Sequence, residues 1–342
     1  MLNFMLYIKL FRSFFYQKRW VNAVLVWLSF YWAKHFKNHQ PWGLPLSLSV
    51  EPTTACNLGC PECPSGLKSF TRPTGNLNLE LFKKIINEQV NTLIYCNFYF
   101  QGEPFIHPKL LDMVSYANHK KIITSSSTNA HFIDLKTAQR IVSSGLSRLI
   151  ISIDGTTQET YEQYRRQGSL DKVIEGTKNL VKAKSLANSR NPQLIFQFLV
   201  VRANEHQTKD VKELAKQLGV DKVVFKTAQL YDYKHGHELM PKNEKYSRYT
   251  LSDTGEYKLK NKLLNQCWRL WSGAVITWDG KVVPCCFDKD ASHEMGNVSK
   301  EPFSHIWNNQ SYRIFRKKLL QSRKEIDICT NCSEGTQVWT GD

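Results

Sequence analysis

The stretch that decides the fold runs Leu46-Ser-Leu-Ser-Val-Glu-Pro-Thr-Thr-Ala-Cys56-Asn-Leu-Gly-Cys60-Pro-Glu-Cys63. It places three cysteines, spaced Cys-x-x-x-Cys-x-x-Cys, directly after a short run that alternates like a β-strand. Iron–sulfur clusters are held by cysteine thiolates, and four thiolates are normally needed to close the shell of a four-iron cluster. Three thiolates on one loop therefore leave one iron free to bind another ligand.

This loop resembles the defining loop of the radical S-adenosylmethionine (SAM) enzymes. The resemblance implies a 4Fe-4S cluster held by Cys56, Cys60 and Cys63, with its open iron chelated by the amino and carboxylate groups of SAM. In that family an electron from the reduced cluster cleaves SAM to a 5′-deoxyadenosyl radical, which abstracts a hydrogen atom. Many members have an aromatic residue just before the third cysteine, where this chain has Glu62.

A structural zinc site is the alternative interpretation of the same three cysteines. Structural zinc takes four protein ligands in a closed tetrahedral shell. No histidine or cysteine lies close enough in the sequence to be the obvious fourth ligand, because the next cysteine is Cys96, in an expected strand. The missing ligand favours the iron cluster.

Short β-like runs alternate with helical patterns from about residue 46 to residue 226, which predicts successive βα units and a parallel sheet. The expected strands are 46–50, 93–100, 121–126, 148–153, 194–201 and 222–227. Helices are expected between them at 78–89, 108–118, 134–144, 169–187 and 204–218. Six units match the partial (β/α)6 TIM-like barrel of radical SAM enzymes, although the alternation alone also fits a flavodoxin-like sheet.

In parallel α/β folds, ligand-binding groups gather at the carboxyl ends of the strands. The second expected strand ends in Gln101-Gly102-Glu103-Pro104, which is similar to the family's Gly-Gly-Glu-Pro element. The resemblance implies that this turn binds the amino group of SAM. Its glycine lets the backbone come close to the ligand.

The third and fourth strands end in further polar motifs. Asn129 closes a Ser-Thr-Asn run similar to the family's Thr-Asn-Gly, and Ser152 and Asp154 belong to Ser-Ile-Asp-Gly, as in the peptide-modifying branch. Arg165 follows Asp154 by eleven residues. The resemblance implies that Ser152 and Arg165 bind the ribose and carboxylate of SAM, and guanidinium suits a carboxylate because the two groups form a forked pair. Arg166 is the alternative to Arg165, and Asp154 is expected to orient neighbouring loops if it does not bind SAM.

A second set of cysteines follows in the C-terminal region, at Cys267, Cys285, Cys329 and Cys332. With a hairpin expected at Gly280, it resembles the auxiliary-cluster module called SPASM when it holds two clusters and twitch when it holds one. Five cysteines are too few for two clusters, so the resemblance implies one auxiliary 4Fe-4S cluster with four cysteine ligands. Cys286 is expected to face away from this set, because neighbouring side chains of a strand alternate, and it is the alternative to Cys285 as the ligand. A zinc ribbon is the alternative for the quartet.

The chain has 342 residues, a formal net charge of +16 and nine cysteines without a convincing signal peptide, which indicates a cytoplasmic metal protein rather than a disulfide scaffold. Residues 1–50 contain no Asp or Glu but many aromatic and basic residues. This segment predicts either a helix in the interface of an anionic membrane or a helix pair packed on the barrel. No nucleic-acid-binding motif is present, and no nucleic-acid partner is expected.

These observations divide the chain into a basic N-terminal helical segment (1–45), the partial barrel (46–230), a linker (231–266) and a small cysteine-rich auxiliary-cluster domain (267–342). The expected function is a radical SAM oxidoreductase that acts on a small polar molecule or a peptide side chain, with the auxiliary cluster accepting an electron. A peptide maturase is the alternative within enzymes, and a non-catalytic zinc scaffold docked on membranes is the alternative outside them. A flavodoxin or ferredoxin, typically acidic, is the expected electron donor.

Overall fold

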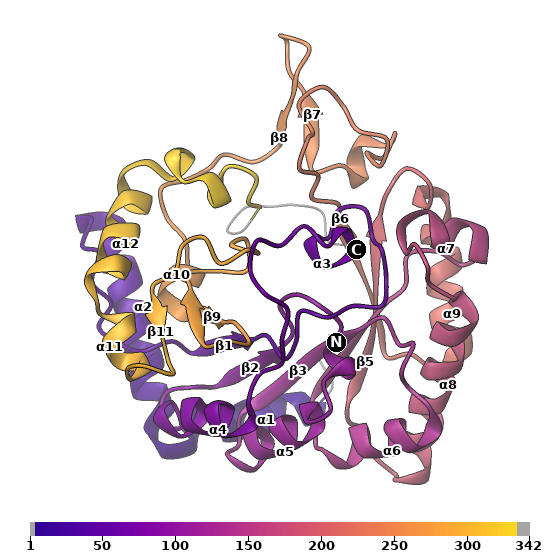
Figure 1. Ribbon diagram of the computed structural model, residues 1–342, viewed down its shortest axis with the longest axis horizontal. Helices are drawn as coiled ribbons and strands as arrows, with labels where there is room; N and C mark the ends of the chain where they lie inside the picture. Colours follow the sequence, from indigo (N-terminus) through magenta and orange to yellow (C-terminus); the bar gives the residue numbers. More distant parts are fainter. Residues whose placement is uncertain (1–3, 334–342) are drawn as a thin grey trace.

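One nine-stranded sheet organises the protein (Figure 1). The computed structural model describes residues 4–333, so the last residues of the expected auxiliary domain, 334–342, lie outside the described part. The strand order is β11-β10-β9-β1-β2-β3-β4-β5-β6, and β1 to β6 all pair in parallel. These six strands are β1 (Ser47–Val50), β2 (Tyr95–Phe98), β3 (Ile123–Thr128), β4 (Arg148–Ser152), β5 (Gln193–Val200) and β6 (Lys222–Thr227).

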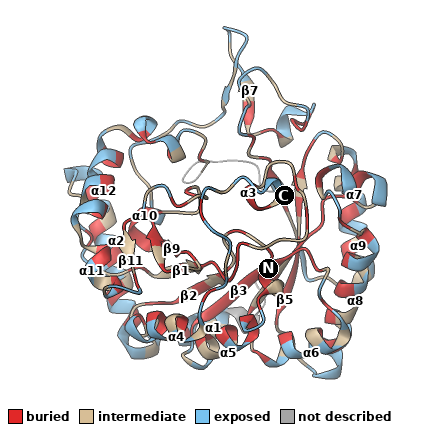
Figure 2. Cartoon of the chain, viewed as in Figure 1, coloured by how far each residue is buried: buried red, intermediate tan, exposed pale blue. Residues whose placement is uncertain are grey.

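Helices follow the strands and cover the outside of the curved sheet, with buried stripes facing the strands and exposed stripes facing solvent (Figure 2). Asn78 begins the first of them by accepting hydrogen bonds from the backbone N–H groups of Glu80 and Leu81. Gly219, at a φ of +77°, ends the last. The helices are α4 (Leu79–Glu88), α5 (Leu110–His119), α6 (Leu135–Ser143), α7 (Gln158–Tyr164), α8 (Leu170–Leu186) and α9 (Asp210–Leu218). The α/β fold expected from the sequence is thus confirmed.

The C-terminal region continues the same sheet. β9 (Gly273–Ile276) pairs in parallel with β1, and β10 (Lys281–Val283) and β11 (Gly296–Asn297) extend it in antiparallel fashion. Gly280, at a φ of +85°, forms the expected hairpin turn. The short α10 (Arg269–Ser272), α11 (Phe303–Trp307) and α12 (Gln310–Ser322) complete this region. The stretch expected as a linker, 231–266, also holds a small hairpin of β7 (Tyr249–Leu251) and β8 (Tyr257–Leu259).

Two N-terminal helices, α1 (Phe4–Phe15) and α2 (Arg19–Phe36), form a hairpin beneath the amino-terminal ends of the strands. The buried Arg19 guanidinium donates hydrogen bonds to the carbonyls of Val90 (2.9 Å) and Lys120 (2.8 Å), in loops that lead from helices into β2 and β3. The hairpin therefore packs on the barrel, at the end opposite to the carboxyl ends of the strands. No helix of the described part is long and apolar enough to cross a membrane.

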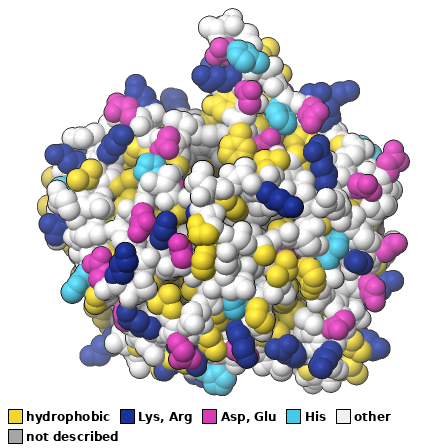
Figure 3. Space-filling view, viewed as in Figure 1, with side chains coloured by type: hydrophobic (Ala, Val, Ile, Leu, Met, Phe, Trp, Pro, Cys, Tyr) yellow, Lys and Arg dark blue, Asp and Glu magenta, His cyan; other side chains and the backbone are white. Residues whose placement is uncertain are grey.

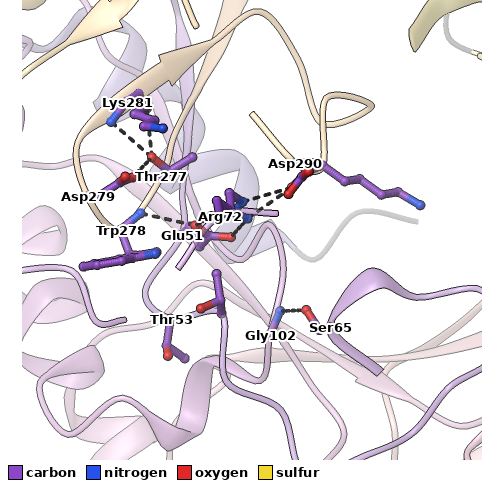
Figure 4. A network of polar contacts seen from close by, with 12 residues as sticks. Glu51, Thr53, Ser65, Arg72, Gly102, Thr277, Trp278, Asp279, Lys281 and Asp290 are labelled. Atoms are coloured by element: carbon purple, nitrogen blue, oxygen red, sulfur yellow. Dashed lines mark hydrogen bonds and ion pairs between the residues drawn. The ribbon is translucent and has the colours of Figure 1, made fainter. Parts of the chain in front are cut away.

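A buried ion pair joins the start of the barrel to the C-terminal hairpin (Figure 4). The Arg72 guanidinium donates two hydrogen bonds of 2.6 Å to the Glu51 carboxylate, whose side chain has no exposed surface. Arg72 also donates to the Lys289 carbonyl, and the Trp278 backbone N–H donates to Glu51. Because each charged group has several partners, the pair ties β1 to the residues around β10.

Replacing Arg72 with Met leaves the Glu51 carboxylate buried without its cation. We expect the free energy of unfolding to fall by about 3–5 kcal/mol, as for other buried pairs broken on one side. The double variant Glu51→Gln/Arg72→Met removes both charges and should regain a large part of that loss. Urea denaturation of both variants measures the difference, and equal stabilities would contradict a role for the uncompensated charge.

Candidate functional site

The three clustered cysteines lie on the loop between β1 and the short helix α3 (Pro64–Leu67), at the carboxyl ends of the strands and at the centre of Figure 1. All three line one cavity of about 160 Å³. The rest of the lining comes from the cysteine loop and α3, from the ends of β2, β3 and β4, which the parallel topology brings together, and from Arg165 just after α7. These residues are Leu58, Ser65, Gly66, Tyr99, Phe100, Gly102, Glu103, Pro104, Ser127, Thr128, Asn129, Ser152 and Arg165.

Two glycines let the cysteine loop close on the end of β2. A Cβ atom on Gly66 would lie 2.5 Å from the backbone nitrogen of Cys60, and one on Gly102 would lie 2.3 Å from the carbonyl oxygen of Thr53. Gly102 also has a φ of +74°, a backbone conformation that is strained for residues with a side chain. Its N–H donates to the Ser65 hydroxyl at 2.9 Å. The turn after β2 is therefore fixed against the loop that carries the cysteines.

Glu103 is a buried carboxylate held by three donors. Its oxygens accept hydrogen bonds from the Thr128 hydroxyl (2.8 Å) and the backbone N–H groups of Asn129 (2.7 Å) and Phe105 (3.1 Å). Burial nevertheless raises the pKa of Glu103 to about 7, because the loss of water outweighs these hydrogen bonds. A further hydrogen-bond donor in the cavity would favour the charged carboxylate. The amino group of SAM is such a donor.

Arg165 reaches the cysteine loop while held by Asp154. Its Nε donates to Asp154 at 2.5 Å, and its Nη1 lies 3.7 Å from the Cys60 sulfur. Asp154 is completely buried, and its other oxygen accepts the Leu199 N–H at 2.6 Å. The ion pair keeps the pKa of Arg165 well above its usual value despite burial. Asp154 therefore positions a permanent cation beside the cavity.

Six of the eight residues expected to bind SAM line the cavity, and two do not. Gly102, Glu103, Pro104, Asn129, Ser152 and Arg165 belong to its lining. Gln101 and Asp154 are buried outside it.

The sequence analysis did not single out Leu58, Ser65, Gly66, Tyr99, Phe100, Ser127 or Thr128 as site residues. For Ser127 and Thr128 a signal was present, since they adjoin Asn129 at a strand end.

The donor set fits an iron cluster. Burial raises the pKa of the Cys56 thiol to about 11 and also raises that of Cys60, where the nearby Arg165 acts in the opposite direction. Iron binding requires thiolates, so the metal would displace these protons and so stabilise the loop. Three sulfurs on one wall, with a carboxylate and a guanidinium nearby, leave room for a ligand on the fourth iron.

The second set of cysteines also comes together. Cys285 is influenced electrostatically by Cys267 and Cys332, and Cys329 by Cys332 and Cys267. Burial raises the pKa of Cys329 to about 12. The buried Arg323 contacts the thiols of Cys329 and Cys332 and also acts electrostatically on Cys267. Cys329 and Cys332 are buried, and Cys267 and Cys285 are half-buried. A cation beside these thiols suits a group that carries negative charge, as a thiolate-bound iron–sulfur cluster does.

Cys285 and Cys286 line the same small pocket beside Arg269, but their packing differs. Cys286, together with Phe100, packs against the small apolar cluster of Val275, Val283 and Ala291. Its sulfur also lies 4.0 Å from Nη1 of Arg269. This placement supports Cys285 rather than Cys286 as the fourth cysteine of the second set. Among residues 4–333, no group of three or more His, Cys, Asp or Glu side chains is arranged to hold a single metal ion.

Two family models match the chain. Residues 50–190 match the radical SAM superfamily, and residues 267–333 match SPASM, an iron-sulfur cluster-binding domain. The chain contains a radical SAM domain followed by a SPASM domain. It is therefore an enzyme that uses SAM and a 4Fe-4S cluster, with an iron–sulfur SPASM domain at its C-terminal end.

Curated relatives align over most of their length. The mycofactocin maturase MftC of Mycobacterium tuberculosis is 27% identical over 305 residues, which cover 84% of this radical SAM chain and 75% of the relative. The PqqA peptide cyclase of Gluconobacter oxydans is 23% identical over 87% of this chain and 85% of the cyclase. The AdoMet-dependent heme synthase of Methanosarcina barkeri is also 23% identical, with 87% and 94% covered.

Solved structures share the fold of this radical SAM chain. Streptococcus suis SuiB bound to SAM superimposes with a TM-score of 0.64 at 15% identity, over 89% of this chain and 75% of SuiB. Native anSMEcpe with bound SAM superimposes with a TM-score of 0.62 at 20% identity, over 86% of this chain and 91% of anSMEcpe. BtrN in complex with SAM and 2-DOIA superimposes with a TM-score of 0.51 at 18% identity, over 87% of this chain and 98% of BtrN.

The contrast between Cys285 and Cys286 gives a matched pair of variants. After anaerobic reconstitution we expect about eight irons per wild-type chain, about four in each of the two clusters. The iron content should fall to about four in Cys285→Ala, because the auxiliary cluster loses one of its four thiolates, and should stay near eight in Cys286→Ala. Iron and sulfide analysis measures the ratio. The opposite result would assign Cys286 to the cluster, and unchanged iron in both variants would contradict a four-cysteine auxiliary site.

Glu103 should make stability depend on pH. Its folded pKa of about 7 lies above the ordinary value of 4.5. The folded state therefore favours the protonated carboxyl, and the free energy of unfolding should fall by about 3 kcal/mol as pH rises from about 4.5 to above 7. Glu103→Gln should flatten this part of the profile. Urea denaturation across this pH range, before SAM is added, provides the measurement, and an unchanged slope would contradict the assignment.

Proposed function

We propose that this radical SAM enzyme oxidises its substrate by two electrons, using one auxiliary 4Fe-4S cluster as the electron acceptor. When bound, SAM and the N-terminal cluster supply the radical that removes a hydrogen atom from the substrate. The observation that carries the proposal is the pairing of an open three-cysteine cavity with a separate set of four cysteines. Four thiolates complete a cluster, which favours electron acceptance over direct binding of the substrate.

Each residue of the cavity has a proposed task. Cys56, Cys60 and Cys63 would hold the cluster, and Glu103 would accept a hydrogen bond from the amino group of SAM. Arg165, oriented by Asp154, is placed to bind the carboxylate of SAM in a forked pair. Ser152 and Asn129 line the same cavity and can form hydrogen bonds with the remaining polar groups of SAM. The polar strand ends would thus bind SAM beside the cluster that the three cysteines hold.

The electrons balance in this scheme. A cluster held by Cys56, Cys60 and Cys63 would pass one electron from a reduced flavodoxin or ferredoxin to SAM, whose cleavage would give methionine and, after hydrogen-atom transfer from the substrate, 5′-deoxyadenosine. The substrate would then give one proton to a base and one electron to a cluster held by Cys267, Cys285, Cys329 and Cys332. A protein acceptor that reoxidises this second cluster would complete the balance. The formal charge of +16 favours acidic redox partners of the cytoplasm in both transfers.

A peptide side chain is the first candidate substrate, because the PqqA peptide cyclase aligns over 85% of its own length. A small non-peptide molecule is the second candidate, since a heme synthase aligns over 94% of its length. Membership in an enzyme superfamily argues against the non-catalytic zinc scaffold considered from the sequence.

The direct test is anaerobic SAM cleavage. With dithionite as reductant, the reconstituted enzyme should release 5′-deoxyadenosine, and Cys60→Ala should abolish the release because the cluster loses one of its three ligands. Cys96→Ala, which changes a fully buried cysteine outside both sets, is the control and should retain cleavage. Liquid chromatography with mass spectrometry measures the nucleoside.

The same assay then separates the substrate classes. With peptide or metabolite pools, a product two hydrogens lighter should appear in proportion to 5′-deoxyadenosine. No nucleoside from the wild-type enzyme would contradict the SAM chemistry, whereas nucleoside with a product of unchanged oxidation state would contradict only the role of the auxiliary cluster.

A further inference from the structure

The outer face of the hairpin formed by α1 and α2 is apolar although it faces solvent. Of the 22 large hydrophobic side chains exposed in the described part of the chain, 14 lie between Tyr7 and Trp42. The exposed fractions of Phe11, Trp27 and Phe36 are 65%, 50% and 64%. A patch of this kind marks a surface that is covered by something else.

The pattern along α2 shows that this face is continuous. The side toward the barrel consists of Arg19, Asn22, Val26, Ser29 and Ala33. The opposite side carries two adjacent stripes at helical spacing, and both stay exposed: Trp20, Val24, Trp27 and Tyr31 in one, and Val21, Leu25, Leu28 and Trp32 in the other. The barrel side includes Arg19, Asn22 and Ser29, so the exposed outer side is the more apolar of the two. In a surface helix the apolar stripe normally faces the interior of the protein, and on α2 it faces outward.

Basic side chains flank this face. Arg12, Lys18, Lys34 and Lys37 are exposed, and residues 1–50 contain no Asp or Glu. Beside α1, the cations Lys9, Arg12 and Lys121 also line a small cleft of about 130 Å³. On the opposite face of the molecule, in contrast, Lys and Arg alternate with Asp and Glu (Figure 3). Within residues 1–50, the charged side chains that border the aromatic face are therefore all basic.

We propose that the outer face of the α1–α2 hairpin binds the surface of an anionic phospholipid membrane. Trp and Tyr favour the level of the lipid head groups, and nearby Lys and Arg are attracted to anionic ones. A second copy fits less well, because a twofold contact would bring the two basic borders together without an acid between them. α2 lies in the interface rather than across the bilayer, as the absence of a spanning helix in the described part requires.

The hairpin would hold the enzyme in one orientation. Besides the Arg19 hydrogen bonds, the Ser13 hydroxyl donates to the Ile94 carbonyl at 3.1 Å, and Phe30 packs edge-on against Trp268 and Trp271. These contacts fix the hairpin to the amino-terminal ends of the strands. The cavity with Cys56, Cys60 and Cys63 lies at the carboxyl ends, so it faces away from the lipid and stays open to redox partners.

Co-sedimentation of the reconstituted full chain with vesicles tests this proposal independently of catalysis. We expect roughly tenfold or stronger binding to equimolar phosphatidylglycerol and phosphatidylcholine than to phosphatidylcholine alone, weakened by high salt. Phe11→Ser/Trp27→Ser/Phe36→Ser should abolish binding, and Arg12→Glu/Lys34→Glu should remove the preference for anionic lipid. Leu186→Ser/Ile314→Ser changes side chains of similar exposure elsewhere and should bind as the wild type does.

Release of 5′-deoxyadenosine by each variant shows that its fold is intact, since none of these residues lies in the cavity. Absence of wild-type binding to either vesicle would overturn the proposal, as would equal binding to both. Sedimentation velocity without lipid tests whether a second copy covers the face instead. A wild-type dimer that becomes a monomer in the Phe11→Ser/Trp27→Ser/Phe36→Ser variant would assign the face to a second copy and overturn the proposal.

Discussion

The whole site depends on one close approach of two backbones, that of Gly102 at the end of β2 to Thr53 and Ala55 before the first cysteine. There is no space for a side chain at this point, and the N–H groups of Gly102 and Glu103 donate to Ser65 and to the Ala55 carbonyl. This contact brings the three sulfurs and the buried Glu103 carboxylate into one cavity. A residue with a side chain at position 102 would push the turn after β2, which carries Glu103, away from the loop that carries the cysteines.

The sequence specified those parts of the structure that follow from local patterns. The strands predicted from β-like runs correspond to β1 to β6, and the cysteine spacing indicated the cavity, because parallel strand ends must meet at one edge. Long-range partners were harder to predict. That Asp154 would turn toward Arg165 and Leu199, and not into the cavity, depends on where β5 lies. The hairpin β7–β8 lies in a polar stretch without strong alternation, so only its packing reveals it.

The N-terminal segment shows how two interpretations of a sequence can both describe part of a structure. A helix pair packed on the barrel and an aromatic, basic helix at an interface were alternatives from composition alone. The structure gives α2 an inner side that packs on the protein and an outer side that does not. Sequence periodicity alone would have turned the apolar side of α2 toward the protein, whereas the packed side is the one that contains Arg19, Asn22 and Ser29.

The pairing of β9 with β1 has a consequence for the timing of the reaction. β1 leads into the loop of the first three cysteines, and β9 leads through a tight turn to β10 and Cys285, so one strand pair links the two sets of thiols. The separation between the two sets of thiols is then set by hydrogen bonds of a sheet core rather than by a hinge. Electron tunnelling from the substrate radical would have a constant path length from one turnover to the next, and a short-lived radical would not have to wait for a domain to move.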